Sequence, residues 1–92
     1  MLSFDWDEWS RNKNEIKHSV SRLEAESAFY DAKKKIFKDQ KHSSEKEERF
    51  ILYGKSLENR ILMAGFTHRN SKVRIITARS ASKKERTLYE KS

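Results

Sequence analysis

Three short segments in the second half of the sequence alternate apolar and polar side chains, which is the pattern of half-buried β-strands. In the first segment Arg49, Ile51 and Tyr53 share one face, whereas Phe50 and Leu52 share the other. The second runs from about residue 60 to 68 and has apolar residues on both faces, which is typical of a central strand covered on both sides. The third runs from about residue 72 to 79. Together they predict an antiparallel sheet.

Small and polar residues lie between these segments or at special positions within them. Asn70 and Ser71 lie between the last two and suit a tight hairpin turn. Gly54 and Gly65 fall within or at the end of strand patterns, where a glycine often marks a bulge or a close approach of two backbones.

Strict alternation along the third segment fixes the predicted direction of its side chains. It places Arg74 on the face opposite Val73 and Ile75. It places Arg79 on the same face as those two residues and Thr77.

The N-terminal residues predict a short strand followed by a helix. Leu2, Phe4 and Trp6 alternate with polar residues, which indicates the strand. Asp7 is positioned to cap a helix that runs to about Lys17. The apolar stripe of this helix is expected to consist of Trp9, Ile16 and Val20.

A second helix is expected directly afterwards. Ser21 and Glu24 have the spacing of a capping box, in which each side chain binds the backbone N–H of the other residue. One face of the helix then carries Ala25, Ala28, Phe29 and Ala32. The two helices predict a helical hairpin.

The remaining segments complete the expected fold. Residues 33–39 are rich in lysine and predict an edge strand, and residues 40–47 predict a polar loop. Ser82 and Glu85 form a second capping box, which opens a C-terminal helix whose Leu88 and Tyr89 would contact the sheet. We therefore expect residues 1–92 to form a single α+β domain. It combines a small, mostly antiparallel sheet of four to five strands with an N-terminal helical hairpin and a C-terminal helix.

Composition narrows the class of protein. Apolar residues make up 35% of the 92 residues, against about 45–50% in ordinary globular chains, so the core is expected to be thin. The chain has no cysteine, which excludes disulfide scaffolds and thiol nucleophiles. Its longest apolar run, residues 61–66, is far shorter than the roughly 18 residues of a membrane span. The acidic start does not resemble a secretory signal, so we expect a soluble, cytoplasmic protein.

Charge is distributed unevenly along the chain. The formal net charge is +7, but residues 1–32 carry 4 basic and 7 acidic side chains, a net −3, and residues 33–92 carry 17 and 7, a net +10. A basic segment of this kind attracts polyanions, and nucleic acid is its usual partner. A solvated surface or an acidic protein partner would produce the same pattern.

The catalytic motifs that the sequence lacks are also informative. The three histidines lie in three different elements without metal-ligand spacing, and there is no glycine-rich phosphate loop and no Gly-x-Ser-x-Gly motif. Metal-free RNA cleavage remains possible because RNA supplies its own 2′-hydroxyl nucleophile, so the protein needs only an acid, a base and cations. The predicted strands supply such groups in Glu47, Glu48, Arg49, His68, Lys72, Arg74 and Arg79.

Several of these residues also have ordinary structural interpretations. His18 follows the first helix and would cap its C-terminus, and His68 ends a strand where it would be solvated. His42 lies in a polar loop and is given no role. Arg79 would form an ion pair with Glu85 or Glu90.

Several strings resemble the BrnT family of bacterial toxins and occur in the same order along nearly the whole chain. The string from Arg74 to Arg79, Arg-Ile-Ile-Thr-Ala-Arg, resembles that family's Arg-Ile-Ile-Ser-Ala-Arg signature, with Thr77 in place of Ser. The family's Asn-x-x-Lys-His-Gly pattern ends here in Ser19 rather than Gly. The other matching residues are Trp6, Asp7, Asn14, Lys17, His18, Glu48, Arg49, Gly54, Ala81, Glu85, Arg86 and Tyr89.

The resemblance implies a ribonuclease toxin of a type II toxin–antitoxin system with a RelE-like fold, which inhibits translation and growth. It implies a cognate antitoxin protein with a DNA-binding domain, a heterotetramer with that antitoxin, and contact with operator DNA only through it. No metal, cofactor or membrane partner is expected. The expected catalytic residues are Arg79, His68, Glu48, Thr77 and His18. The expected RNA-binding residues are Arg49, Lys72, Arg74, Lys83, Lys84 and Arg86.

Two other function classes fit the same sequence. One is a non-catalytic nucleic-acid-binding module, such as a transcription co-regulator, which would leave RNA intact. The other is a protein-interaction domain whose basic face binds an acidic partner, with little salt-sensitive affinity for RNA.

Overall fold

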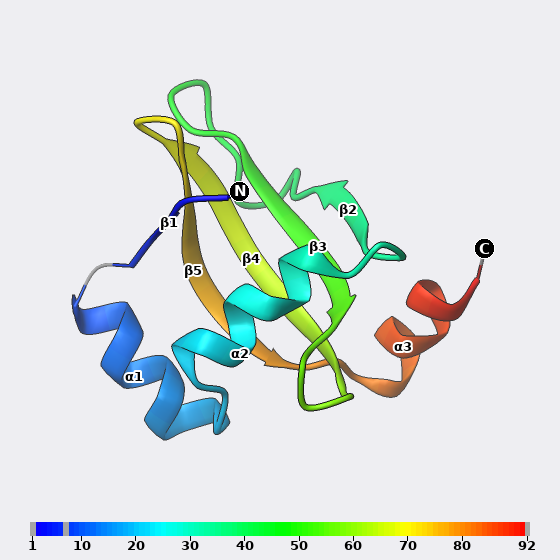
Figure 1. Ribbon diagram of the computed structural model, residues 1–92. Coiled ribbons are helices and arrows are strands. Elements are labelled where there is room, and N and C mark those ends of the chain that lie inside the picture. Colours follow the sequence, from blue (N-terminus) through cyan, green and yellow to red (C-terminus); the bar gives the residue numbers. More distant parts are fainter. Residues whose placement is uncertain (1, 7, 92) are drawn as a thin grey trace.

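The computed structural model describes residues 2–6 and 8–91, with only the backbone described for residues 8–11. Five strands within this part of the chain form one sheet in the order β1-β5-β4-β3-β2 (Figure 1). The strands are β1 (Phe4–Asp5), β2 (Lys35–Lys38), β3 (Arg49–Lys55), β4 (Ile61–Arg69) and β5 (Lys72–Ser80). Each predicted strand is therefore present.

The sheet is mostly antiparallel, as predicted. The pairs β2–β3, β3–β4 and β4–β5 are antiparallel, whereas β1 runs parallel to β5 with Phe4 opposite Val73. Asn70 and Ser71 form the turn between β4 and β5 with φ angles of 52° and 63°. Two successive positive φ angles are the signature of a type I′ hairpin turn, so the predicted turn is confirmed.

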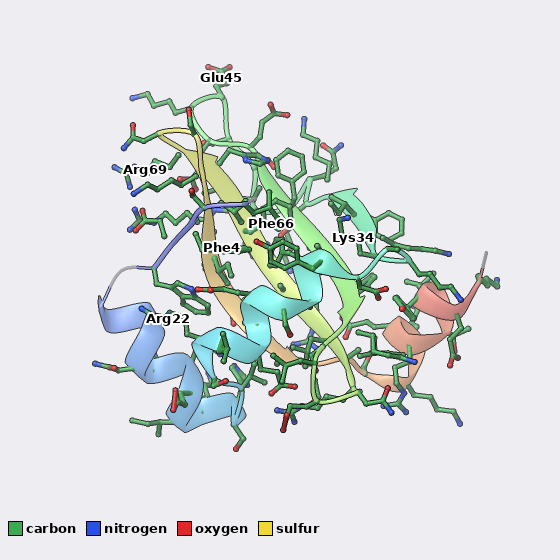
Figure 2. The ribbon with its side chains drawn as sticks, viewed as in Figure 1. Phe4, Arg22, Lys34, Glu45, Phe66 and Arg69 are labelled. Carbon is green, nitrogen blue, oxygen red and sulfur yellow. The ribbon has the colours of Figure 1, made fainter. Side chains whose placement is uncertain are left out.

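Helical segments cover one face of this sheet. They are α1 (Glu8–His18), α2 (Arg22–Ser27) and a 3₁₀ turn, η1 (Ala28–Tyr30), with α2 lying across the sheet in Figure 1. Phe29 packs edge-on against Phe4 and Phe66, with ring centroids 5.3 and 5.1 Å apart; Figure 2 labels both partners. The buried core consists of Val20, Ala25, Ala28, Phe29, Leu52, Leu62, Ala64, Phe66, Val73, Ile75 and Ala78.

The apolar stripe predicted for the first helix is wrong at Ile16, which is 85% exposed. Among the described side chains of α1, Asn14 is the buried one instead, and two residues along a helix correspond to a rotation of about 200°. Val20 is buried as predicted, but it lies beyond the last helical residue, His18. The predictions for Asp7 and for the side chain of Trp9 lie outside the described residues.

The second helix is shorter than predicted and only half of its capping box forms. The chain becomes extended at Asp31, so Ala32 is exposed rather than packed on the core. The Ser21 hydroxyl accepts a hydrogen bond from the backbone N–H of Glu24, as expected. The Glu24 carboxylate, however, accepts hydrogen bonds from Arg60 and Ser56. The hairpin packing of α1 and α2 and the RelE-like class stay predictions.

The close approach predicted at glycine positions is confirmed at Gly54. A Cβ atom at this position would lie 2.5 Å from the carbonyl oxygen of Ala28, so a side chain would push η1 away from β3. The sheet and its helical cover therefore pack closely because this residue is glycine.

The C-terminal helix α3 (Lys83–Glu90) begins with the complete capping box predicted for Ser82 and Glu85. Its far end is held beside β2, because the Tyr89 hydroxyl donates to Asp31 and the Lys35 ammonium donates to the Leu88 carbonyl. Figure 1 shows α3 well apart from α1 and α2. Leu62, Ala64 and Phe66 on one face of β4 are buried, but Ile61, Met63 and Gly65 on the other are only half-buried, whereas the sequence pattern predicted cover on both sides.

Candidate functional site

The face of the sheet opposite α1 and α2 carries three rows of side chains that the strand register places across β3, β4 and β5. We call this the open face. Basic residues occupy the two outer rows, and smaller or apolar residues occupy the middle row. The rows are Tyr53–Met63–Arg79, Ile51–Gly65–Thr77 and Arg49–Thr67–Arg74.

Arg79 lies on the open face because β5 contains a β-bulge. Gly65 pairs with Thr77 but its neighbour Phe66 pairs with Ile75, so Ile76 is an extra residue in β5. The alternation of side chains is therefore reversed after the bulge. The prediction that Arg79 shares a face with Val73 and Ile75 is wrong for this reason.

The open face contains a cavity of about 350 Å³, which is the size of a typical small-molecule site. Apolar side chains of β3, β4 and β5 form its floor, and charged groups surround them. The lining residues are Asp39, His42, Arg49, Phe50, Ile51, Met63, Gly65, Phe66, Ile76, Thr77 and Arg79.

Arg79 makes a two-pronged ion pair with the first turn of α3. Its Nη1 and Nη2 atoms donate to the two carboxylate oxygens of Glu85 at 2.8 and 3.0 Å. The hydrogen bonds that Arg79 donates to Glu85 raise the pKa of Arg79 and lower the pKa of Glu85. Of the two partners that the sequence suggested, Glu85 is the one that binds Arg79.

The other two arginines of these three rows also have carboxylate partners. Arg49 donates from Nε to Glu47 at 2.7 Å, and about a third of its side chain, 37%, is exposed. Arg74 lies 3.4 Å from a carboxylate oxygen of Asp5 in the neighbouring strand β1. The open face thus presents guanidinium groups that carboxylates hold in position, which suits the planar, two-oxygen recognition of phosphate.

A histidine to which the sequence assigned no role lies at the same cavity. The Nδ1 atom of His42 is 2.8 Å from the Oδ2 atom of Asp39, and both residues line the cavity with Arg49 and Arg79. The signal in the sequence was the Asp-x-x-His spacing just before a strand. It was missed because a polar loop has no periodicity that shows where its side chains point.

Glu48 and His68 are brought together, but in a second depression of about 510 Å³. The His68 ring lies edge-on to Phe50 and Phe66, on the strand face that carries the core, and Glu48 pairs with Lys38 at 3.2 Å. Figure 2 labels Glu45 and Arg69 at this end of the molecule. The depression is lined by Glu45, Lys46, Glu47, Glu48, Phe50, Thr67, His68 and Arg69.

The two remaining predicted catalytic residues, Thr77 and His18, do not lie together with Glu48 and His68. Thr77 lines the cavity of the open face, but its hydroxyl donates to the side-chain oxygen of Asn14 on α1 at 3.2 Å. The same Asn14 oxygen accepts the backbone N–H of Ala78, so Asn14 fixes the edge of β5. His18 is the last residue of α1 and is half-buried. The five predicted catalytic residues therefore do not line one common cavity.

The predicted RNA-binding residues fall into two groups. Arg49 and Arg74 belong to one row of the open face, and Lys72 begins β5 beside the hairpin turn. Lys83, Lys84 and Arg86 lie on α3, beyond the other end of β5. The nine residues of that strand span about 27 Å.

The described residues were compared with the requirements of a metal site and of a membrane-spanning helix. Among them, no group of three or more His, Asp or Glu side chains is arranged to hold a metal ion. Within residues 2–6 and 8–91, no helix is long and apolar enough to cross a membrane.

Comparison with known proteins gives the family. The family model for "Ribonuclease toxin, BrnT, of type II toxin-antitoxin system" matches residues 6–85. The chain has the fold of the Brucella abortus ribonuclease toxin BrnT in its 1.1 Å crystal structure, with a TM-score of 0.64 and 24% sequence identity over 90% of this chain and 100% of the other. No match was found among curated protein sequences. With most of its length covered by the family model, the chain belongs to the BrnT family of ribonuclease toxins of type II toxin–antitoxin systems.

Proposed function

We propose that this toxin is a metal-independent endoribonuclease that cleaves RNA in the cavity of the open face, in the cytoplasm, and so inhibits translation and growth. The observation that carries the proposal is the grouping of Arg49, Arg79 and His42 around one cavity with an apolar floor. Cations and a titratable ring on a sheet surface are what this reaction needs, because RNA brings its own nucleophile.

In the proposed reaction the 2′-oxygen of a ribose attacks the adjacent phosphorus. The O2′–P bond forms, the P–O5′ bond breaks, and the products are a 2′,3′-cyclic phosphate and a 5′-hydroxyl. The guanidinium of Arg79 binds two phosphoryl oxygens and stabilises their developing charge. In the structure the two Glu85 oxygens bind the guanidinium in this way, so RNA displaces Glu85 from Arg79.

The other residues predicted from the sequence are assigned to RNA binding or to an alternative acid–base pair outside this cavity. Arg49, Lys72 and Arg74 would bind phosphates along β3 and β5, and Lys83, Lys84 and Arg86 would bind phosphates along α3. Glu48 and His68 are the alternative acid–base pair in the second depression, with Thr77 and His18 as supporting groups.

As a member of a type II toxin–antitoxin family, the chain has an antitoxin protein as its partner and RNA as its substrate. We propose that the antitoxin covers the open face, since burying its arginines would hide them from RNA and supply charge complementarity. The antitoxin would carry the DNA-binding domain, form a heterotetramer with the toxin and make all contacts with operator DNA. If the complex cleaved RNA at the rate of the free toxin, this arrangement would be wrong.

The test is cleavage of a long messenger transcript by the purified toxin in EDTA, with and without ribosomes, and with Mg²⁺ added back in parallel. We expect shortened RNA whose new 3′ ends carry a cyclic phosphate, at equal rates with and without Mg²⁺. RNA that stays intact under all of these conditions while it binds the protein would instead identify a non-catalytic binding module.

A further inference from the structure

We infer that His42 is the catalytic residue that takes the proton from the 2′-hydroxyl, and that Asp39 is the positioning residue that holds its ring. This inference rests on the proposed function, because it names the proton-transfer group of the same cavity. The proton-transfer group is then in the loop before β3, and not at Glu48 or His68, which the sequence suggested.

Asp39 binds His42 through both of its carboxylate oxygens. Oδ1 accepts the backbone N–H of His42 at 3.3 Å, and Oδ2 lies 2.8 Å from the ring Nδ1. The Asp39 side chain is 17% exposed, whereas 56% of the His42 side chain is exposed. A shielded carboxylate thus holds a ring whose other edge is accessible to a substrate.

The contact determines which ring nitrogen is available for catalysis. An ionised carboxylate only accepts hydrogen bonds, so the Nδ1 atom of His42 carries the proton in this pair. In the neutral ring Nε2 then has a free lone pair and acts as the base. A carboxylate on the far side of the ring also stabilises the imidazolium that forms when Nε2 takes a proton.

The loop is anchored to the cavity wall by Ser43. Its hydroxyl donates to the Asp39 carbonyl at 2.7 Å and accepts the backbone N–H of Arg49 at 2.9 Å. The backbone N–H of Asp39 donates to the Arg49 carbonyl at 2.8 Å. The Asp39–His42 pair is therefore fixed against the first residue of β3, whose own side chain lines the cavity.

A purely structural turn would not require the ring contact. The backbone N–H of His42 already satisfies one Asp39 oxygen, and that bond alone is the usual capping interaction of such a turn. The second oxygen is used to orient the imidazole at the edge of the arginine-lined cavity. The other charged side chains that line the cavity are Arg49, which pairs with Glu47, and Arg79, which pairs with Glu85.

The proton balance of the step is complete with these residues. The Nε2 atom takes the 2′-hydroxyl proton as the O2′–P bond forms. The resulting imidazolium, or water, returns a proton to the departing 5′-oxygen. Nothing beyond RNA and the protein is consumed.

The experiment compares His42→Ala, His42→Gln and Asp39→Asn with the unchanged toxin in single-turnover cleavage at saturating protein. General acid–base groups typically contribute about 10²–10⁴-fold, so both His42 variants are expected to cleave at least about 100-fold more slowly. RNA affinity and melting temperature should stay unchanged. Added imidazole should restore part of the rate to His42→Ala. Asp39→Asn should shift the pH–rate profile towards lower pH, which a merely structural role would not do.

The matched control is Gln40→Ala, an exposed neighbour in the same turn, which should cleave at the rate of the unchanged toxin. Cleavage by either His42 variant within threefold of the unchanged toxin would overturn the assignment while leaving the proposed function intact. A loss confined to RNA affinity, or a loss that follows a lowered melting temperature without rescue by imidazole, would overturn it as well. If the unchanged toxin itself does not cleave RNA, the proposed function fails first.

Discussion

At the level of single residues, variants of Arg79 test whether this side chain only forms a structural ion pair or also binds phosphate. Arg79→Ala is expected to lower the cleavage rate by about 100-fold or more, because a preorganised charge opposite the phosphoryl oxygens is lost. Its stability should fall by no more than about 1 kcal/mol, since the pair with Glu85 is partly exposed. Arg79→Lys should recover only part of the rate, because lysine keeps the charge but not the planar fork.

Glu85→Gln is the matched control for Arg79, because it weakens the same ion pair but leaves the guanidinium in place. Cleavage and melting temperature of the two variants are compared under the same conditions. Equal losses of cleavage in Arg79→Ala and Glu85→Gln would show that the ion pair, and not the guanidinium, supports activity.

Ser19 occupies a backbone conformation that favours glycine. Its φ angle is 55°, at the end of α1, where the resembling family pattern has glycine. Ser19→Gly should therefore raise the free energy of unfolding by about 0.5–1 kcal/mol, as measured by chemical denaturation. Ser19→Ala keeps the strained φ angle and serves as the control, which should show no gain.

At the level of elements, one buried ion pair fastens α2 to the turn between β3 and β4. Glu24 accepts two hydrogen bonds from Arg60 at 2.6 Å, and its side chain is only 5% exposed. Glu24→Gln should lower the free energy of unfolding by about 2 kcal/mol, which is less than for a fully buried pair because Arg60 is 38% exposed. In the same denaturation series, Arg22→Gln should cost under about 0.5 kcal/mol, since its pair with Glu26 is 3.8 Å long and about half of the Arg22 side chain is exposed.

The elements also show which parts of the fold the sequence could predict. Strand positions, the Asn70–Ser71 turn and both serine N-caps depend on neighbours along the chain, and they agree with the structure. The partner of Glu24 depends on Arg60, 36 residues away, so a local capping rule could not identify it. Similarly, the position of His42 at the cavity depends on how its loop packs against β3.

At the level of the whole molecule, the stability of the toxin should decline in acid. Hydrogen bonds from Arg60 lower the pKa of Glu24 below its usual 4.5, and those from Arg79 do the same for Glu85. Burial raises the pKa of Asp31, but hydrogen bonds from Tyr89 and two backbone N–H groups outweigh it, so its pKa falls below the usual 3.8. The stabilisation by these groups is complete above about pH 4.5 and is lost as the pH falls through their lowered pKa values.

Denaturation curves between pH 7 and pH 2 test this expectation. The free energy of unfolding should be nearly level down to about pH 5 and then fall, and the fall should be shallower in the double variant Glu24→Gln and Glu85→Gln. A profile that the double variant leaves unchanged would show that other carboxylates control acid stability.

The charge of the whole molecule makes a further prediction about RNA affinity. Residues 33–92 carry a net charge of +10, so binding should release several counterions and weaken steeply as salt is added. Replacing Arg49 by Gln should reduce the slope of log affinity against log salt by about 0.7, the value for one phosphate contact on a single strand. A binding curve that does not change with salt would count against phosphate recognition.

The β-bulge at Ile76 also limits how this protein can change during evolution. Substitutions in β5 alter one side chain at a time, and loss of Ile76 would leave Ile75 and Thr77 adjacent, still opposite Phe66 and Gly65, with Arg79 still on the open face. One residue inserted between Thr77 and Arg79 would instead reverse the alternation again and turn Arg79 towards the apolar core. Descendants of this chain can therefore lose the bulge residue and keep the open face, whereas a residue gained after the bulge would take Arg79 out of the cavity.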